Sequence, residues 1–331
     1  MVDASLLRVA VLAGGFSGEA NVSRRSAAMV MEYIDRDAYD PVLIHIDRER
    51  WWTEVDGRVL EVNRDTLSIE DGKIDLAFVM VHGTPGEDGL LQAHLDFCGI
   101  PHTTASARVM ATTFHKGWTT SLLRDAGMHV ARSVECLPNE AWGDEDVQRT
   151  VDRVGLPCFV KPNESGSSIG VSKVSEAHEL WGAVEAARET GTSTVLVESL
   201  LAGREFTCGV IPDGQGGLQA LPITEIVSHN DFFDYAAKYD GQSHEITPAD
   251  IDDASKEAMQ RTAKEVYRVL HLQGMARVDM MMDVGQLPHV IEVNTVPGFS
   301  AQSIIPQQAA CVGLDKTALI SRIIEDALAR H

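Results

Sequence analysis

Two short apolar segments near the C-terminus, MARVDMMM and HVIEVNT, carry four polar residues at regular spacing. If the segments form a hairpin centred on residues 285–286, Asp279 lies opposite Glu292. In the same register Arg277 lies opposite Asn294, and period-2 alternation puts all four side chains on one face. Two carboxylates and an amide oxygen form the hard oxygen cage that suits Mg²⁺, with phosphate oxygens completing its shell. An arginine beside the cage can neutralise a phosphoryl group or an oxyanion.

A tight turn follows this cage. Pro297-Gly298 comes soon after Asn294 and completes the pattern ExNxxPG, which would expose backbone N–H groups beside the metal. For the hairpin alone, a solvated sheet face with a chance ion pair is an equally good interpretation. The turn favours the metal site.

A second candidate is the segment KPNESGSSIG, from Lys161 to Gly170. Its lysine ends a short apolar strand, and the small residues that follow let backbone amides and the hydroxyls of Ser167 and Ser168 approach phosphates. The segment has no GxxxxGK[ST] pattern, and a strand is expected after it, so it is not a Walker A loop. Taken alone, a Gly/Ser loop is usually only a loop, and the phosphate assignment depends on the metal cage.

A third candidate is VLVESLLAGREF, in which Glu198 ends one strand and Glu205 opens the next. Glu198 could accept a hydrogen bond from an adenine amino group, and Glu205 could accept from ribose hydroxyls. Leu200 and Leu201 would offer apolar surface to the base. Taken alone, both acids are more often exposed residues of an acidic protein.

The elements that position these residues begin with an open parallel sheet. Short apolar runs near the N-terminus predict its strands, and a helix with apolar positions over 27–34 joins the first two. Ligands of such sheets lie outside the carboxyl ends of the strands, where the Gly-rich loops 14–19 and 82–89 fall. The first loop is only a weak dinucleotide fingerprint, because G-x-G-x-x-G is incomplete. The predicted strands are Arg8–Ala13, Pro41–Ile46 and Ile74–Val81.

Two further units are expected after this sheet. A helical stretch from Ala107 to Ala126 opens the second unit, and strands at 158–161 and 171–174 follow it. The third unit should begin with a strand at 194–200, continue at 205–211 and end with the hairpin and a C-terminal helix after Asp315. A polar, aromatic stretch over 228–247 is typical of a long covering loop, and a helix is expected after Pro248. The predicted domains are 1–105, 106–193 and 194–331.

Composition limits the partners. The 331 residues include 28 Lys plus Arg against 49 Asp plus Glu, a formal net charge of −21 at pH 7. This acidity argues against nucleic acid and anionic membranes as partners, although salt adaptation could produce the same balance. No apolar run approaches the ~20 residues of a membrane helix. Five scattered cysteines without a CxxC pair indicate reduced thiols in a cytoplasmic protein, and the dispersed histidines make zinc unlikely.

The motifs in their order along nearly the whole chain resemble those of the ATP-grasp ligases, and among these the D-alanine–D-alanine ligase family. Each motif is moderately specific, and the ordered set is very specific. The motifs are GGFSGEANVS, HGTPGEDG, KPNESGSSIGVSKV, VLVESLLAGREFT, FFDYAAKYDG, ARVD and IEVNTVPGFSAQSIIP.

The resemblance implies an α/β fold with an N-terminal open parallel sheet domain, followed by a two-part ATP-grasp fold that sandwiches the nucleotide. It implies two Mg²⁺ (or Mn²⁺) ions on Asp279, Glu292 and Asn294, and an oxyanion site made by Arg277 and Gly298. Tyr239 would close the site with Ser167, and Lys238 and Ser303 would receive the second substrate's carboxylate. The resemblance implies that Lys116, Lys161, Glu198, Leu201 and Glu205 bind ATP. The Gly/Ser loop described above adds Ser167 and Ser168 to these predicted ATP-binding residues.

The implied reaction joins two D-alanines for cell-wall precursor synthesis. ATP would phosphorylate the first carboxylate, and the second amine would displace phosphate. A ligase for a different first amino acid and a nucleotide-binding regulator without turnover are alternatives, whereas a dehydrogenase is poorly supported. The family often dimerises, so a homodimer is possible.

The first substrate's site departs from the family pattern. Asn21 stands where the family commonly has an acid that holds the first ammonium, although Glu19 matches another family acid. An amide solvates an ammonium less strongly than a carboxylate does. Gln302 replaces a histidine found in many members before Ser303, and His82, which matches a residue near the first substrate, could compensate.

Overall fold

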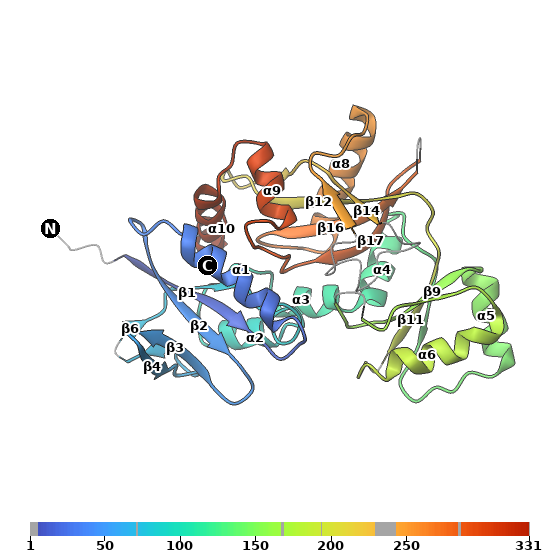
Figure 1. Ribbon diagram of the computed structural model, residues 1–331, viewed down its shortest axis with the longest axis horizontal. Coiled ribbons are helices and arrows are strands. Elements are labelled where there is room, and N and C mark those ends of the chain that lie inside the picture. Colours follow the sequence, from blue (N-terminus) through green and yellow to red (C-terminus); the bar gives the residue numbers. More distant parts are fainter. Residues whose placement is uncertain are drawn as a thin grey trace.

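Three larger sheets and the helices that cover them make up the computed structural model (Figure 1). Ser167, Ser168, Lys238 and Tyr239, which carry predicted roles, lie outside the residues that the structure describes, as does residue 285 of the predicted hairpin centre. Within the described residues no helix is both long and apolar enough to span a membrane. The described residues are 6–70, 72–166, 169–192, 194–228, 243–283 and 286–330.

The N-terminal sheet has the strand order β4-β3-β2-β1-β7. β1 is parallel to both β2 and β7, as expected, and β3 and β4 extend the sheet as an antiparallel edge. The Gly-rich loops therefore lie at the carboxyl ends of β1 and β7, as predicted. A small antiparallel pair, β5 and β6, lies apart from the sheet. The bounds are β1 Leu7–Gly14, α1 Ala20–Tyr33, β2 Tyr39–Ile46, β3 Trp51–Val55, β4 Arg58–Glu61, β5 Ser68–Ile69, β6 Gly72–Lys73, β7 Leu76–Val79 and α2 Leu90–Phe97.

The second sheet is antiparallel, with the order β10-β9-β11-β8. The prediction that residues 194–200 open the third unit is wrong, because β11 pairs with β9 and β8 inside this second sheet. A short strand does not reveal its partners when they lie far away in the sequence. The bounds are β8 Ser133–Cys136, α5 Asp144–Val154, β9 Cys158–Pro162, β10 Ser172–Val174, the 3-10 helix η1 Ala177–Glu179, α6 Leu180–Arg188 and β11 Val195–Ser199.

The third sheet has the order β15-β14-β12-β16-β17, and β13 pairs with β12. β12 is its long inner strand, and α8, the helix expected after Pro248, packs against it with Met259, Ala263 and Val266 buried. The bounds are β12 Arg204–Pro212, β13 Leu218–Ala220, β14 Thr224–Ser228, β15 Ser243–Ile246, α8 Asp253–Val269, β16 Ala276–Met282, β17 His289–Asn294, α9 Ile304–Cys311 and α10 Lys316–Arg330.

Two helices, not one, connect the first and second sheets. α3 (Ala107–Phe114) and α4 (Lys116–Asp125) are separated at His115, whose backbone is extended (φ −85°, ψ 98°). The His115 ring then caps α4, because its Nδ1 accepts a hydrogen bond from the Trp118 N–H (3.2 Å). The break makes Lys116 the first residue of α4, and the helix lies against β17 and α8 between the sheets (Figure 1).

The N-terminal sheet and the C-terminal helices share one core. Phe78 of β7 lies 6.2 Å from Phe299, measured between ring centroids, and both are fully buried with Ile320 of α10. The second sheet has its own cluster, which includes Val160, Val197 and Leu180. The first and third sheets are therefore joined by buried apolar surface, and the second sheet is held mainly by its own core.

Candidate functional site

The hairpin of β16 and β17 has the predicted register at the candidate cage. Asp279 pairs with Glu292 and Arg277 pairs with Asn294. A register shift follows immediately, so that Met280 pairs with Val290. The bulge leaves the four polar side chains on the same cavity and moves the rest of the hairpin by one residue.

Asp279 is the most enclosed member of this group, only 7% exposed. Arg277 donates two hydrogen bonds to its carboxylate, from Nε to Oδ1 and from a terminal nitrogen to Oδ2, each 2.8 Å long. The Thr207 hydroxyl donates to Oδ1 (2.5 Å), and the Asn294 amide to Oδ2 (2.9 Å). Burial alone would lower the pKa of Arg277, but the Asp279 carboxylate outweighs it and raises that pKa, so the guanidinium stays charged.

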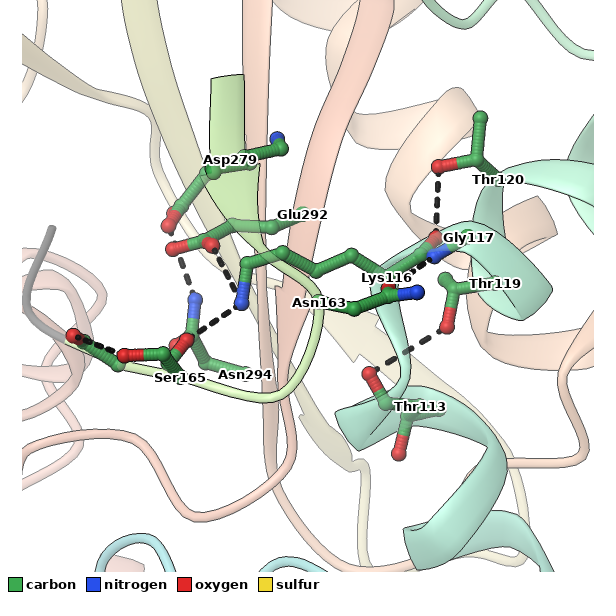
Figure 2. A network of polar contacts seen from close by, with 12 residues as sticks. Thr113, Lys116, Gly117, Thr119, Thr120, Asn163, Ser165, Asp279, Glu292 and Asn294 are labelled. Atoms are coloured by element: carbon green, nitrogen blue, oxygen red, sulfur yellow. Dashed lines mark hydrogen bonds and ion pairs between the residues drawn. The ribbon is translucent and has the colours of Figure 1, made fainter. Parts of the chain in front are cut away.

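The donor set fits a hard divalent cation. Figure 2 shows the carboxylates of Asp279 and Glu292, the Asn294 amide and the Lys116 ammonium pointing toward one another. Carboxylate and amide oxygens are the ligands that Mg²⁺ and Mn²⁺ take. Two neighbouring carboxylates repel each other, and Arg277 and Lys116 flank them with positive charge. The structure thus brings Asp279, Glu292 and Asn294 together on two adjacent strands, and their role as metal ligands stays a prediction.

Lys116 reaches this cage from the first turn of α4. Its Nζ donates to the Ser165 carbonyl (2.6 Å) and lies 3.8 Å from Glu292 Oε2 (Figure 2). Burial lowers the pKa of Lys116, and the Glu292 carboxylate opposes that shift. The lysine also lines both cavities described below, so it stands where they meet.

A cavity of about 560 Å³ lies between the second and third sheets. The buried side chains of Lys161 and Glu198 form an ion pair in its wall. Leu200 and Leu201 form part of its apolar lining, as predicted, whereas the sequence did not indicate Phe159 and Met281. Period-2 alternation in CFVKP could have signalled Phe159, which pairs with Glu198 across the sheet. The predicted ATP-binding residues on this cavity are Lys116, Lys161, Glu198, Leu201 and Glu205.

A second cavity, of about 320 Å³, lies between the N-terminal loops and the third sheet. The structure brings Glu19 and His82 together here with Arg277, Gly298 and Ser303. The two cavities share Lys116 and Glu292, so a nucleotide in one would meet a small molecule in the other at the carboxylate cage.

The loop after β9 approaches the second cavity closely. A Cβ added at Gly166 would lie 2.7 Å from Glu19 Oε2, so glycine is what lets this backbone pass beside the carboxylate. Glu19 therefore lies between the loop after β1 and the loop that the sequence assigned to phosphates.

Asn21 does not join the site. Its side chain is exposed, and its Oδ1 accepts a hydrogen bond from Arg24 (2.9 Å) on the surface of α1. Helix α1 begins at Ala20, directly after Glu19. Asn21 therefore lies on the exposed side of the first turn and does not line the cavity that Glu19 lines. The predicted role of Asn21 in binding the first substrate is wrong for this geometry, and Glu19 is the acid that the cavity offers.

His82 lines the cavity with both ring nitrogens engaged. Nδ1 lies 2.7 Å from the Val296 carbonyl, which can only accept, so Nδ1 carries the proton. Nε2 then accepts from the Ser26 hydroxyl (3.0 Å). Burial lowers the pKa of His82, so the ring is neutral. His82 thus holds the backbone that leads to Gly298.

Glu87 is a cavity residue that the sequence did not single out. Its Oε2 accepts from the Gly83 N–H (2.8 Å), and its Oε1 accepts from the Val296 N–H (3.2 Å). Burial, followed by the charge of Glu19, raises the pKa of Glu87 to about 7. An acid in a Gly-rich loop at the carboxyl end of a buried strand was the available signal.

Nearly the whole chain is similar to known proteins. Residues 8–105 match the family description "D-ala D-ala ligase N-terminus", and residues 122–325 match "D-ala D-ala ligase C-terminus". A D-alanine–D-alanine ligase of Porphyromonas gingivalis is 40% identical over 325 residues, covering 97% of each chain. The VanG D-Ala:D-Ser ligase from Enterococcus faecalis has a similar structure, with a TM-score of 0.86 and 30% identity over 97% of this chain and 99% of that one. The Bacillus anthracis D-alanine–D-alanine ligase complexed with ATP has a TM-score of 0.80 and 28% identity over 98% of each chain.

Proposed function

Because the chain belongs to the D-alanine–D-alanine ligase family, we propose that it joins two D-alanines to D-alanyl-D-alanine for peptidoglycan precursor synthesis, with ATP as co-substrate. The observation that carries the proposal is the junction of the two cavities. Glu292 and Lys116 line both cavities, and Asp279 and Arg277 line the smaller one beside them. A phosphoryl group can pass there from a nucleotide on one side to a carboxylate on the other.

In the first step the carboxylate of one D-alanine attacks the γ-phosphoryl group of ATP and forms an acyl phosphate and ADP. Lys116 and Lys161 bind the phosphates, and Glu198, Leu201 and Glu205 bind the base and ribose. Glu19 holds the ammonium of this D-alanine. Asp279, Glu292 and Asn294 would hold two Mg²⁺ or Mn²⁺ ions, which would neutralise charge on the phosphoryl oxygens.

In the second step the amine of another D-alanine attacks the acyl phosphate, and phosphate leaves. Arg277 and the Gly298 N–H stabilise the oxyanion that forms on the attacked carbonyl. Ser303 receives the second carboxylate, together with Lys238. The predicted closure of the site by Tyr239 and Ser167, which would exclude water from the acyl phosphate, stays a prediction.

The proposed domain organisation follows the sheets. We propose an N-terminal domain over 1–105, a central ATP-grasp unit that ends after β11, and a C-terminal unit that begins with β12. The five cysteines are free, which supports the cytoplasm as the compartment.

The test is a product assay with a substrate panel. Purified protein is mixed with ATP, Mg²⁺ and D-alanine, phosphate release is followed, and products are identified by mass spectrometry. D-Serine and D-lactate in place of the second substrate, and other D-amino acids in place of the first, form the panel. We expect D-alanyl-D-alanine as the main product. No phosphate and no dipeptide, or a clear preference for another first amino acid, would overturn the proposal.

A further inference from the structure

Amide formation requires an unprotonated amine, whereas the α-amino group of free D-alanine is an ammonium at neutral pH. The attacking nitrogen must therefore lose a proton inside the site before it can form a bond. We infer that Glu87 accepts this proton and so activates the second amino acid, an inference that rests on the proposed ligase function.

Glu87 is held in place for this role. It lines the 320 Å³ cavity with Arg277 and Gly298. Each of its oxygens accepts one backbone N–H, from Gly83 (2.8 Å) and from Val296 (3.2 Å), which fixes the carboxylate. A carboxylate oxygen has a further lone pair, so both oxygens can still accept a proton. Val296 stands two residues before Gly298, so the carboxylate is anchored beside the turn proposed for the oxyanion.

The histidine of the same loop has a different task. His82 Nδ1 donates to the Val296 carbonyl, and Nε2 accepts from Ser26. Its basic lone pair is thus occupied, and burial lowers its pKa. His82 and Glu87 together bind both polar groups of the Val296 backbone, with the histidine as donor and the carboxylate as acceptor. His82 is a positioning residue in this arrangement.

The charges around Glu87 suit a proton acceptor. Burial raises its pKa to about 7, and the Glu19 carboxylate at the start of α1 acts in the same direction. Lys116 of α4 and the two backbone hydrogen bonds oppose the shift, and His82 is neutral. An acceptor whose pKa lies near the working pH transfers protons efficiently in both directions. Glu19 is occupied by the first ammonium and cannot serve the second amine.

The step balances as follows. One proton moves from the ammonium to a Glu87 oxygen, and the freed electron pair of the nitrogen forms the C–N bond to the acyl carbon. The C–O bond to phosphate breaks, and phosphate takes the electron pair. The surplus N–H proton passes to the departing phosphate, and Glu87 later returns its own proton to water.

The experiment compares two nucleophiles on one acyl phosphate. Hydroxylamine is already unprotonated at neutral pH and gives D-alanine hydroxamate without a proton acceptor. We expect Glu87→Gln to lower dipeptide formation by ~10²–10⁴-fold and hydroxamate formation by less than tenfold. Glu245→Gln is the matched control, because Glu245 is another carboxylate on this cavity. It should leave the ratio of the two products unchanged.

The pH profile is the second readout. In the wild type, kcat for dipeptide formation should rise with pH through about 7, the pKa of Glu87, and hydroxamate formation should lack this limb. In Glu87→Gln this rise near pH 7 should be absent, and the residual rate should increase with pH only as the fraction of unprotonated D-alanine amine increases. Thermal unfolding checks the variant's fold, and the wild-type profiles test the inference even if the variant is unstable.

Three results would overturn the inference: an equal loss of both products in Glu87→Gln, a selective loss of dipeptide in Glu245→Gln instead, or a wild-type limb shared by both nucleophiles. A wild-type protein that forms neither product contradicts the proposed function instead, so the two failures are distinguishable.

Discussion

Glu292 supplies the more open of the two carboxylates in the cage and lies 3.8 Å from the Lys116 Nζ. Glu292→Gln keeps the shape of the side chain and removes its charge. We expect kcat to fall at least ~10²–10³-fold, because the carboxylate cage beside the phosphoryl group loses one negative charge. Steady-state phosphate release at saturating Mg²⁺ measures the effect, and Glu292→Asp, which keeps the charge, should retain more activity. Near wild-type rates in Glu292→Gln would show that the cage is assigned wrongly.

Glu87 also links stability to pH. Its pKa is raised from 4.5 to about 7 in the folded protein. Between these values the folded protein keeps a proton that the unfolded chain releases, so this group lowers the free energy of unfolding as pH rises through that window. Glu87→Gln should remove this dependence, changing the difference between wild type and variant by up to ~3 kcal/mol. Urea denaturation of both proteins at either end of the window measures it. A difference that does not vary with pH would contradict the assignment.

At the scale of single residues, the sequence predicted which side chains face each other across the hairpin of β16 and β17. Asp279 and Glu292 could be paired because alternation in a strand has a fixed period and the turn was close in sequence. Asn21 was misplaced because the direction of a side chain in the first turn of α1 depends on where the helix begins. Glu87 was overlooked because its importance comes from burial against Val296, more than two hundred residues away.

At the scale of elements, Gln308 joins α9 to β12 beneath the cage. Its Oε1 accepts a hydrogen bond from the Gly209 N–H, and its Nε2 donates one to the Thr207 carbonyl. These groups lie where the pairing of β12 changes from β14 to β13. Gln308→Ala would leave buried backbone groups unpaired and should lower the free energy of unfolding by about 1–3 kcal/mol for each group. Gln307→Ala, at the neighbouring and partly exposed position, should cost less than ~0.5 kcal/mol. Urea denaturation compares them, and equal losses would count against the role of Gln308.

Local signals predicted most elements, whereas pairing over long distances was not predictable. The strands β1, β2 and β9 were found from short apolar runs bounded by glycine or proline. β11 was assigned to the wrong sheet, because its partners β8 and β9 are known only once the chain folds back on itself. The break at His115 was also missed, since nothing in its neighbours marks a helix end and the ring itself supplies the cap.

At the scale of the molecule, positive side chains gather at the candidate site although the chain as a whole is strongly negative. The chain carries a net charge of −21, yet Lys116, Lys161 and Arg277 converge on the two cavities. Composition argued against polyanionic partners, but it could not show where the cations gather. An anionic nucleotide is accepted because these cations act at close range, where the local field exceeds the screened field of the distant surface.

Phe299 couples the first and third sheets through their shared core. It is fully buried against Phe78, and its N–H donates to Ser26 (3.1 Å) one residue after Gly298. Phe299→Ala should lower the free energy of unfolding by about 3–5 kcal/mol, and Phe299→Leu should cost less because most of the volume remains. Hydrogen exchange should show lost protection in β1 and β7, while β9 and β11 keep theirs, since the second sheet has a separate core. An equal loss in all three sheets would mean that the second sheet depends on the same core.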